Sequence, residues 1–216
     1  MKKKLWITIL VLTMTTAVFA QKAEPERSFR YKLTDDEKGI VITAYTGTNP
    51  NLVIPRTIEG YPVKKIGTEG LVGISVVNIC GTDLRNSSRL LQTVIVPEGV
   101  EIIGEHTFSN CINLRKVVLP STVYLIESSA FGYCSNLAEI NIPTGISIID
   151  YGAFQNCGEL YDLIIPTSIT SIDFGFLDHW GRKTASGNQF RGCGKIRIAT
   201  RKKLEELGYV DGFSNY

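Results

Sequence analysis

Histidine, methionine and tryptophan are scarce in this 216-residue sequence, each occurring only twice. His106 and His179 are too few for most metal centres or catalytic triads, and no C-x-x-C pair supports a zinc site. No nucleophile-elbow sequence and no glycine-rich phosphate loop is present. The sequence therefore predicts neither an enzyme nor a cofactor. The one catalytic alternative left open is a hydrolase that uses Asp178 and His179.

A strong net charge of either sign is also missing. The chain has 23 Lys and Arg against 21 Asp and Glu, a formal net charge of +2. Residues 1–20 contain three lysines and no acidic residue, so the rest of the chain has a formal net charge of −1. A nearly neutral surface lacks the basic footprint of nucleic-acid binding. We therefore expect no nucleic-acid partner.

Long apolar runs are confined to the first 20 residues. The run LWITILVLTMTTAV follows three lysines and leads to a small-residue step that ends at Ala20, which predicts a secretory signal peptide cleaved before Gln21. No later segment approaches the roughly 20 apolar residues of a spanning helix. We expect a secreted, cell-surface or periplasmic protein with no integral membrane segment after cleavage.

A 23-residue period dominates residues 91–172. Three sets of residues recur at this spacing: Leu91, Leu114, Leu137 and Leu160; Pro97, Pro120, Pro143 and Pro166; and Phe108, Phe131, Phe154 and Leu177. The alternation before each proline predicts short strands near residues 92–96, 115–119, 138–142 and 161–165, paired in parallel. The pair Val100 and Ile103 begins the returning side of a coil, and the phenylalanines fill the interior. The fold class predicted is a mainly β, right-handed solenoid of four regular repeats.

A single coil cannot bury its own apolar face, so both ends of the array need caps. Alternation at residues 29–33 and 40–44 predicts a hairpin that closes the first coil. The segment from Leu52 resembles a repeat with about five extra residues, and an irregular coil with a strand at residues 76–80 follows. After the insertion, Phe190 and Cys193 restore the F-x-x-C element. A strand at 195–198 then leads to a cap helix with Thr200 as its N-cap.

The predicted organisation has six parts. They are a signal peptide at 1–20, a linker and β-hairpin cap at 21–51, irregular first repeats at 52–90, four regular repeats at 91–172, an insertion loop at 173–189, and a last partial repeat with a helical cap at 190–216.

The repeat unit L-x-x-V-x-[IL]-P-x-x-[VI]-x-x-I-x-x-x-[AT]-F-x-x-C resembles the BspA-like, or Treponema-type, bacterial leucine-rich repeats. The opening ITAYTGTNPNLVIPRTIEGYPVKKIG, residues 42–67, resembles the entry segment of that family. The resemblance covers roughly residues 29–210. It implies a leucine-rich-repeat solenoid in a surface or secreted protein of a host-associated bacterium. Some family members are adhesins for host or bacterial proteins, and the family carries no catalytic motif.

Four of the five cysteines share one repeat position, three residues after the interior phenylalanine. We predict buried free thiols for Cys111, Cys134, Cys157 and Cys193, because in-register stacking makes their Cβ vectors parallel and a disulfide needs a torsion near 90°. A disulfide and a metal site remain the alternatives.

Residues between the inward positions form three outward columns along the strands. These are Gln92, Arg115, Ala138 and Tyr161; Thr93, Lys116, Glu139 and Asp162; and Ile95, Val118, Asn141 and Ile164. The simpler interpretation is a row of ordinary solvated positions. As a group, an apolar row beside mixed charges and an aromatic ring is typical of an interface. The candidate protein-binding residues are Arg115, Lys116, Val118, Glu139, Asn141, Tyr161, Asp162 and Ile164.

The insertion is the second candidate surface, because a long insertion among short turns is often functional. It contains Phe174 and Trp180, and Trp180 is the further candidate contact. The expected partner is an extracellular protein, from host matrix or from another bacterial surface, bound by a monomer. The alternative is a structural or assembly component of the cell envelope.

Overall fold

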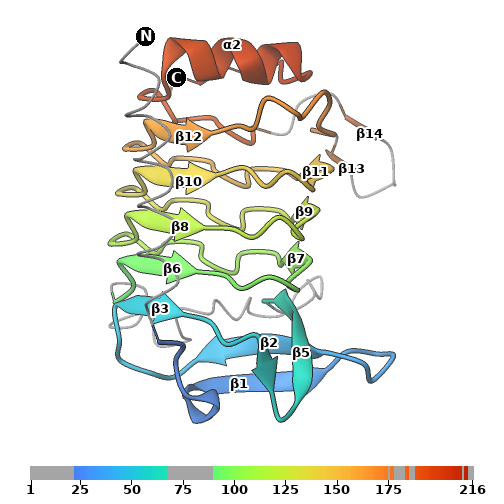
Figure 1. Cartoon of the computed structure of the whole chain (residues 1–216). Helices are drawn as coiled ribbons and strands as arrows, with labels where there is room; N and C mark the ends of the chain where they lie inside the picture. Colours follow the sequence, from blue (N-terminus) through green and yellow to red (C-terminus); the bar gives the residue numbers. More distant parts are fainter. Residues whose placement is uncertain are drawn as a thin grey trace, which may run out of the picture.

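The computed structural model describes residues 22–67, 90–174, 176–177, 183–184, 188–210 and 212–213. Two sheets run along different sides of a stack of coils (Figure 1). The strand-face sheet contains the parallel strands β3 (Asn51–Val53), β6 (Thr93–Ile95), β8 (Lys116–Val118), β10 (Glu139–Asn141) and β12 (Asp162–Ile164). The return sheet contains β1 (Phe29–Leu33), β2 (Ile40–Tyr45), β4 (Thr57–Ile58), β5 (Tyr61–Ile66), β7 (Ile102–Ile103), β9 (Leu125–Ile126) and β11 (Ile148–Ile149).

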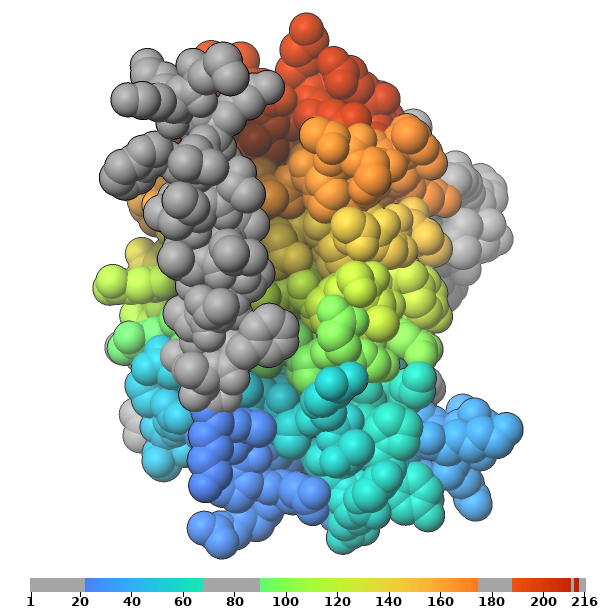
Figure 2. All heavy atoms as spheres, in the orientation of Figure 1, coloured from blue at the N-terminus to red at the C-terminus, as the bar shows by residue number. Residues whose placement is uncertain are grey.

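The predicted solenoid and its parallel strands are confirmed. Strands of the strand-face sheet pair at the repeat spacing, with Thr93 opposite Lys116 and Glu139 opposite Asp162. The residues between them, including Val94, Val117 and Ile140, point inward and are buried. Figure 2 shows the coils as successive bands along the stack. Each band covers the apolar face of the next, which is how a repeat array gains stability.

The segment from Leu52 forms the first coil, as predicted. Strand β3 pairs directly with β6, with Leu52 opposite Val94, and β5 pairs with β7, with Ile66 opposite Ile103. The extra residues belong to an unpredicted hairpin of β4 and β5. Its turn has positive φ at Glu59 and Gly60, the geometry of a two-residue hairpin turn. The strand predicted at residues 76–80 lies outside the described residues.

A column of phenylalanine rings forms the centre of the core. Phe108, Phe131, Phe154 and Phe190 are fully buried, and neighbouring ring centroids lie 5.3, 5.4 and 5.2 Å apart with nearly parallel planes. The last member confirms that Phe190, 36 positions after Phe154 in the printed sequence, restores the interior position. Leu177, which follows Phe154 at the repeat spacing, instead lies in the short strand β13 (Phe176–Leu177), paired with β14 (Lys183–Thr184).

The turn before each phenylalanine requires a left-handed residue. His106, Ser129 and Gly152 occupy this position with φ values of 51°, 52° and 58°. His106 is therefore a turn residue. Such a backbone conformation is unfavourable for most side chains, and the hydrogen bonds between coils hold it in place. The His106 amide donates to Ser128 O at 3.0 Å, and the Ser129 amide donates to Tyr151 O at 2.8 Å.

The cysteine position has a hydrogen-bonding role beyond its small size. The thiols of Cys134, Cys157 and Cys193 donate to the carbonyl oxygens of Phe108, Phe131 and Phe154 at 3.0, 3.2 and 3.0 Å. All three are buried and free, as predicted. The prediction of a free thiol is wrong for Cys111, which is disulfide-bonded. Cys134, Cys157 and Cys193 are all free, so the disulfide of Cys111 is not formed with another cysteine of this stacked column.

Burial also controls the chemistry of these thiols. It raises the pKa of Cys134 to about 12 and raises that of Cys157 well above its ordinary value. Because the thiolate is the reactive form, we expect iodoacetamide at pH 8 to leave both residues unlabelled in the folded protein and to label them after denaturation. Peptide mass spectrometry would measure this. Equal labelling rates in the folded and denatured protein would contradict the assigned burial.

The N-terminal hairpin cap is confirmed at the predicted residues. Strands β1 and β2 pair antiparallel, and β2 then pairs in parallel with β5 of the first coil. The segment before β1 covers the other sheet, because the Glu24 amide donates to Val53 O at 2.9 Å. Glu24 also accepts a hydrogen bond from Tyr45 Oη at 3.3 Å. The hairpin therefore covers the N-terminal end of the return sheet, and the segment before β1 contacts β3 at the N-terminal end of the strand-face sheet.

The C-terminal cap differs from the prediction at its start. Helix α2 (Ile198–Glu206) lies over β12 (Figure 1), and Leu204 and Leu207 are buried beneath it as predicted. There is no strand at residues 195–198, and the N-cap is Arg197 in place of Thr200. The first helical hydrogen bond runs from the Arg201 amide to Arg197 O at 3.0 Å. The helix thus begins as soon as the chain has passed the interior residue Ile196.

Candidate protein-binding surface

The outer side of the strand-face sheet carries the predicted columns. In the first column Gln92, Arg115 and Tyr161 are exposed, and in the third Ile164 is exposed while Ile95 and Val118 are half-buried. Tyr161 is 46% exposed and Ile164 is 50% exposed, which is unusual for large apolar side chains on a packed β-sheet. They lie at either end of β12 and so mark the C-terminal part of this surface.

The central column forms pairs between neighbouring coils. Thr93 Oγ1 donates to Asn51 Oδ1 at 2.9 Å, and Lys116 Nζ lies 2.7 Å from Glu139 Oε1. Asp162 pairs with Arg197 at 3.2 Å. The structure therefore brings Lys116 and Glu139 together, whereas the sequence analysis predicted each as a separate contact for a partner. Their charges are neutralised locally, so this column is a polar ridge with little excess charge.

Asn141 has a structural role within the third column. Its Nδ2 donates to Leu119 O at 2.8 Å, and its Oδ1 accepts from the Leu119 amide at 2.8 Å. The side chain thereby replaces the next pair of the ladder between β8 and β10, whose register ends at Ile140 and Val117. The side-chain amide of Asn141 is thus hydrogen-bonded to the backbone of Leu119, although the residue remains at the surface.

Three of the candidate residues are exposed in the part of the chain that the structure describes. No ion pair joins Arg115 to another described residue, and its side chain is exposed. The Tyr161 ring lies under the guanidinium of Arg197, with 5.8 Å between Arg197 Cζ and the ring centroid, so its position is supported from one side. Ile164 is half exposed. Arginine, tyrosine and a β-branched apolar residue on a rigid sheet are the residue types that supply binding energy at interfaces.

Arg197 is a further candidate residue, which the sequence analysis placed only within the strand predicted at residues 195–198. It contacts both Tyr161 and Asp162, and so extends the surface beyond β12. The sequence spacing could have identified it, because Arg197 follows Cys193 by the same number of positions as Tyr161 follows Cys157.

The insertion contributes less than predicted in its described part. Phe174 is buried, and its ring packs edge-on against Phe190 and Tyr209 at centroid distances of 6.4 and 5.5 Å. It belongs to the core of the C-terminal cap and cannot contact a partner. Trp180 lies outside the described residues, as do Asp178 and His179 of the hydrolase alternative.

The described residues contain no group of three or more His, Cys, Asp or Glu side chains that could hold a metal ion. In the same part of the chain, no helix has the length and apolar character needed to cross a membrane.

Comparison with known proteins identifies the repeats. Residues 79–179 match the BspA type leucine rich repeat region in six copies. This part of the chain, a little under half of it, is therefore similar to BspA-type leucine-rich repeats. The match includes residues 79–90, which precede the regular 23-residue units, so the BspA-type pattern begins earlier than the strict period. A comparison with curated proteins gives no significant match.

Solved structures of bacterial leucine-rich repeat proteins are similar to this chain. A leucine-rich repeat protein from Bacteroides ovatus is 21% identical with a TM-score of 0.52, over 78% of this chain and 44% of that one. One from Bacteroides capillosus is 24% identical with a TM-score of 0.50, over 64% of this chain and 94% of that one. The leucine-rich repeat protein of T. pallidum is 24% identical with a TM-score of 0.42, over 90% and 100% of the two chains. At these identities the first two show the fold alone.

Proposed function

We propose that this chain is an exported, adhesin-like protein-binding module whose strand-face sheet docks an extracellular protein. The observation that carries the proposal is the pair of exposed apolar side chains, Tyr161 and Ile164, on a sheet whose charged column is already paired. Large apolar groups on a soluble surface lose free energy when a partner removes them from water. Arg115, which forms no ion pair with another described residue, adds a site for a hydrogen-bonding or acidic group of that partner.

The rigidity of the sheet supports binding over catalysis. Each strand is hydrogen-bonded to the next coil, so the outward columns keep fixed spacings of about 4.8 Å from coil to coil. A surface fixed in this way loses little conformational entropy when a partner docks. Leucine-rich repeats in general are binding and structural modules, and the histidines of this chain are a turn residue and a residue outside the described part.

Export is supported by two features. The first 20 residues have the pattern of a cleavable signal, and Cys111 is disulfide-bonded. Disulfides persist in oxidising compartments outside the cytoplasm and are rare inside it. We therefore place the protein in the periplasm, on the cell surface or in the medium, where a host matrix protein or another bacterial surface protein would be the partner.

Affinity capture tests the proposal and its alternative together. The protein without residues 1–20 is immobilised and exposed in parallel to host extracellular-matrix extract and to bacterial envelope extract. We expect a matrix or surface protein to be retained, and to be lost with Tyr161→Ser/Ile164→Asp. A control, Tyr124→Ser/Ser147→Asp, introduces the same serine and aspartate at exposed residues of the return side.

The outcomes separate the candidate functions. A ligand from the envelope alone, bound through the same face, would replace the adhesin by a structural or assembly component of the envelope. Equal loss of the ligand with the test and control variants would remove the strand face as the docking surface.

A further inference from the structure

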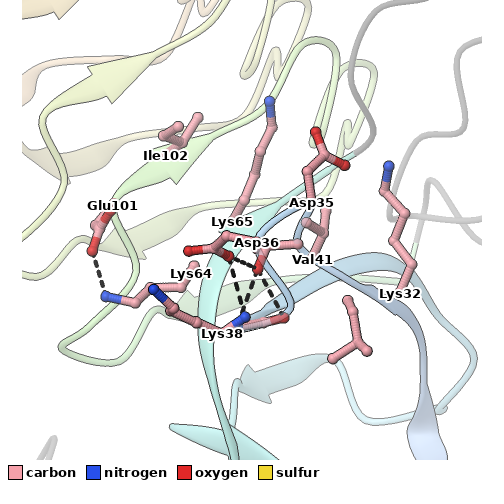
Figure 3. Close-up of a pocket in the computed structure, with 12 residues that line it drawn as sticks. Lys32, Asp35, Asp36, Lys38, Val41, Lys64, Lys65, Glu101 and Ile102 are labelled. Carbon is pink, nitrogen blue, oxygen red and sulfur yellow. Dashed lines mark hydrogen bonds and ion pairs between the residues drawn. The ribbon is translucent and has the colours of Figure 1, made fainter.

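A groove of about 600 Å³ lies beside the β1–β2 turn on the return side (Figure 3). Its charged side chains balance one another: Lys32 and Lys38 with Asp35 and Asp36, and Lys64 and Lys65 with Glu101 and Glu127. Because cations and acids are equal in number, the groove selects neither an acidic nor a basic ligand. The turns that follow the interior phenylalanines have a more specific chemistry.

The turn after each interior phenylalanine contains a left-handed residue. Asn110, Tyr133 and Asn156 occupy this position with φ values of 60°, 62° and 59°. Each is hydrogen-bonded to the next coil in the same way, since the Asn110 amide donates to Gly132 O at 2.9 Å and the Tyr133 amide donates to Gln155 O at 2.7 Å. Because the backbone and its register repeat, the three side chains project in the same direction, about 4.8 Å apart. We call these three residues the turn column.

Tyr133 does not suit its backbone position. Asparagine and glycine tolerate a positive φ, and the last coil has Gly192 here with a φ of 81°. A tyrosine with positive φ is an outlier, and strained residues of this kind gather at functional sites. The Tyr133 side chain is also 46% exposed, so burial in the core does not offset the strain. Folding alone therefore gives no reason for a tyrosine at this position.

The surroundings of Tyr133 are polar but uncharged. Residues 107–114, 128–138 and 152–158, which form this edge of three coils, contain no Asp, Glu, Lys or Arg. The Tyr133 hydroxyl and the Asn156 side-chain amide form no hydrogen bond with another described residue. Asn110 Nδ2 donates to Ser109 Oγ at 3.3 Å, which leaves Asn110 Oδ1 as an acceptor. The turn column thus offers an aromatic ring with an amide on each side.

This chemistry favours a small neutral ligand over a protein. A stable protein interface buries about 800 Å² on each side around an apolar centre, whereas the turn column has a single half-exposed ring. A pyranose sugar has a C–H face that can lie on an aromatic ring, and hydroxyl groups that can bond to flanking amides. From Asn110 to Asn156 the column spans roughly 10 Å, which is enough for two linked sugar rings.

We infer that the turn column binds a neutral oligosaccharide, with one sugar ring stacked on Tyr133 and hydroxyl groups hydrogen-bonded to Asn110 and Asn156. The absence of charge along this edge selects a neutral sugar, and the ring provides the stacking surface. The site is separate from the strand face and does not depend on the function proposed for that face. A shallow site with one ring predicts weak binding, in the millimolar range for a disaccharide.

Saturation-transfer difference NMR with the purified protein tests this inference. The probes are the neutral disaccharides cellobiose, lactose and N,N′-diacetylchitobiose. The control compound is sorbitol, which is also a neutral polyol but has no ring. We expect at least one disaccharide to bind in the millimolar range through its C–H protons, and sorbitol not to bind. Equal binding of sorbitol, or no binding of any of the disaccharides, would overturn the inference.

Substitutions in the turn column locate the site. Tyr133→Asn removes the ring and introduces the residue that suits a positive φ. Binding should therefore weaken by at least about tenfold, while the thermal midpoint stays equal or rises. Asn156→Gly removes one amide at a position where Gly192 shows that glycine is accommodated, and it should weaken binding severalfold. If Tyr133→Asn lowers the thermal midpoint as well as binding, Asn156→Gly decides, and normal binding by that variant would overturn the inference.

Two controls separate this site from other exposed aromatic rings. Tyr124→Asn removes an exposed ring on the return side, and Tyr161→Ser/Ile164→Asp alters the strand face. Both should bind the disaccharide like the wild type, so a failure of the strand-face proposal leaves this result unaffected. Normal binding by Tyr133→Asn, or an equal loss in Tyr124→Asn, would mean that the sugar does not bind at the turn column.

Discussion

The substitution Phe131→Ala is expected to lower the free energy of unfolding by about 3–5 kcal/mol. The ring is fully buried and lies between Phe108 and Phe154, with centroid distances of 5.3 and 5.4 Å. Its removal would leave a cavity in the middle of the stack. The coils cannot close this cavity easily, because the Phe131 amide donates to Ala153 O at 2.8 Å and the Phe108 amide donates to Ala130 O at 2.7 Å.

Equilibrium urea unfolding of the purified protein would measure the loss. The control is Tyr124→Ala in the same repeat, where an exposed aromatic ring is removed and the expected change is within about 0.5 kcal/mol. An unfolding midpoint for Phe131→Ala that equals the wild-type midpoint would mean that the register of the stack is wrong. A large loss in Tyr124→Ala would mean that the two substitutions do not distinguish core from surface.

The regular part of the fold was predictable because every coil has the same neighbours. Val94, Val117 and Ile140 each meet an equivalent residue one coil away, so a single periodic pattern determines the strand, its direction and its register. The N-terminal hairpin was predictable for a related reason, since alternation on both sides of a polar turn is a local signal.

At the ends of the array the periodic pattern stops, so it could not predict the structure there. The residues after Ile196 have no following coil to pair with, and the chain begins a helix where the repeat would have placed a strand. The hairpin of β4 and β5 depends on Glu59 and Gly60 adopting positive φ, which the periodic pattern does not encode. An adjacent Glu and Gly between apolar residues is the only local sign of that turn.

For the candidate surface, the positions of the side chains were predictable from the sequence, but the interactions between them were not. Alternation identified which side chains point outward, and the structure places all eight strand-face candidates on the outer side of the sheet or at its margin. It could not show that Lys116 pairs with Glu139 or that Asn141 bonds to Leu119, because a periodic pattern gives no side-chain conformation. The pairing reduces the free charge on the surface and leaves Arg115, Tyr161 and Ile164 as candidate contacts that no ion pair between described residues occupies.

The variant Tyr161→Ser/Ile164→Asp is expected to reduce affinity for a captured partner by more than about thirtyfold, which corresponds to a loss of about 2 kcal/mol. Its free energy of unfolding should change by no more than about 1 kcal/mol, since both side chains are about half exposed and the contact of Tyr161 with Arg197 lies at the surface. Burying the new aspartate against an apolar partner would add a desolvation cost to the lost contact.

Affinity and thermal midpoint are therefore measured together against one partner, for the wild type, this variant and Tyr124→Ser/Ser147→Asp. Arg115→Ala would show whether the open cation contributes, and Trp180→Ala would test the insertion in the same assay. A matched fall in affinity and thermal midpoint would mean that the double substitution unfolds the protein and not that it removes contacts. If every strand-face variant folds and binds like the wild type while the control loses affinity, the partner docks on the return side around Tyr124, and the strand-face assignment fails.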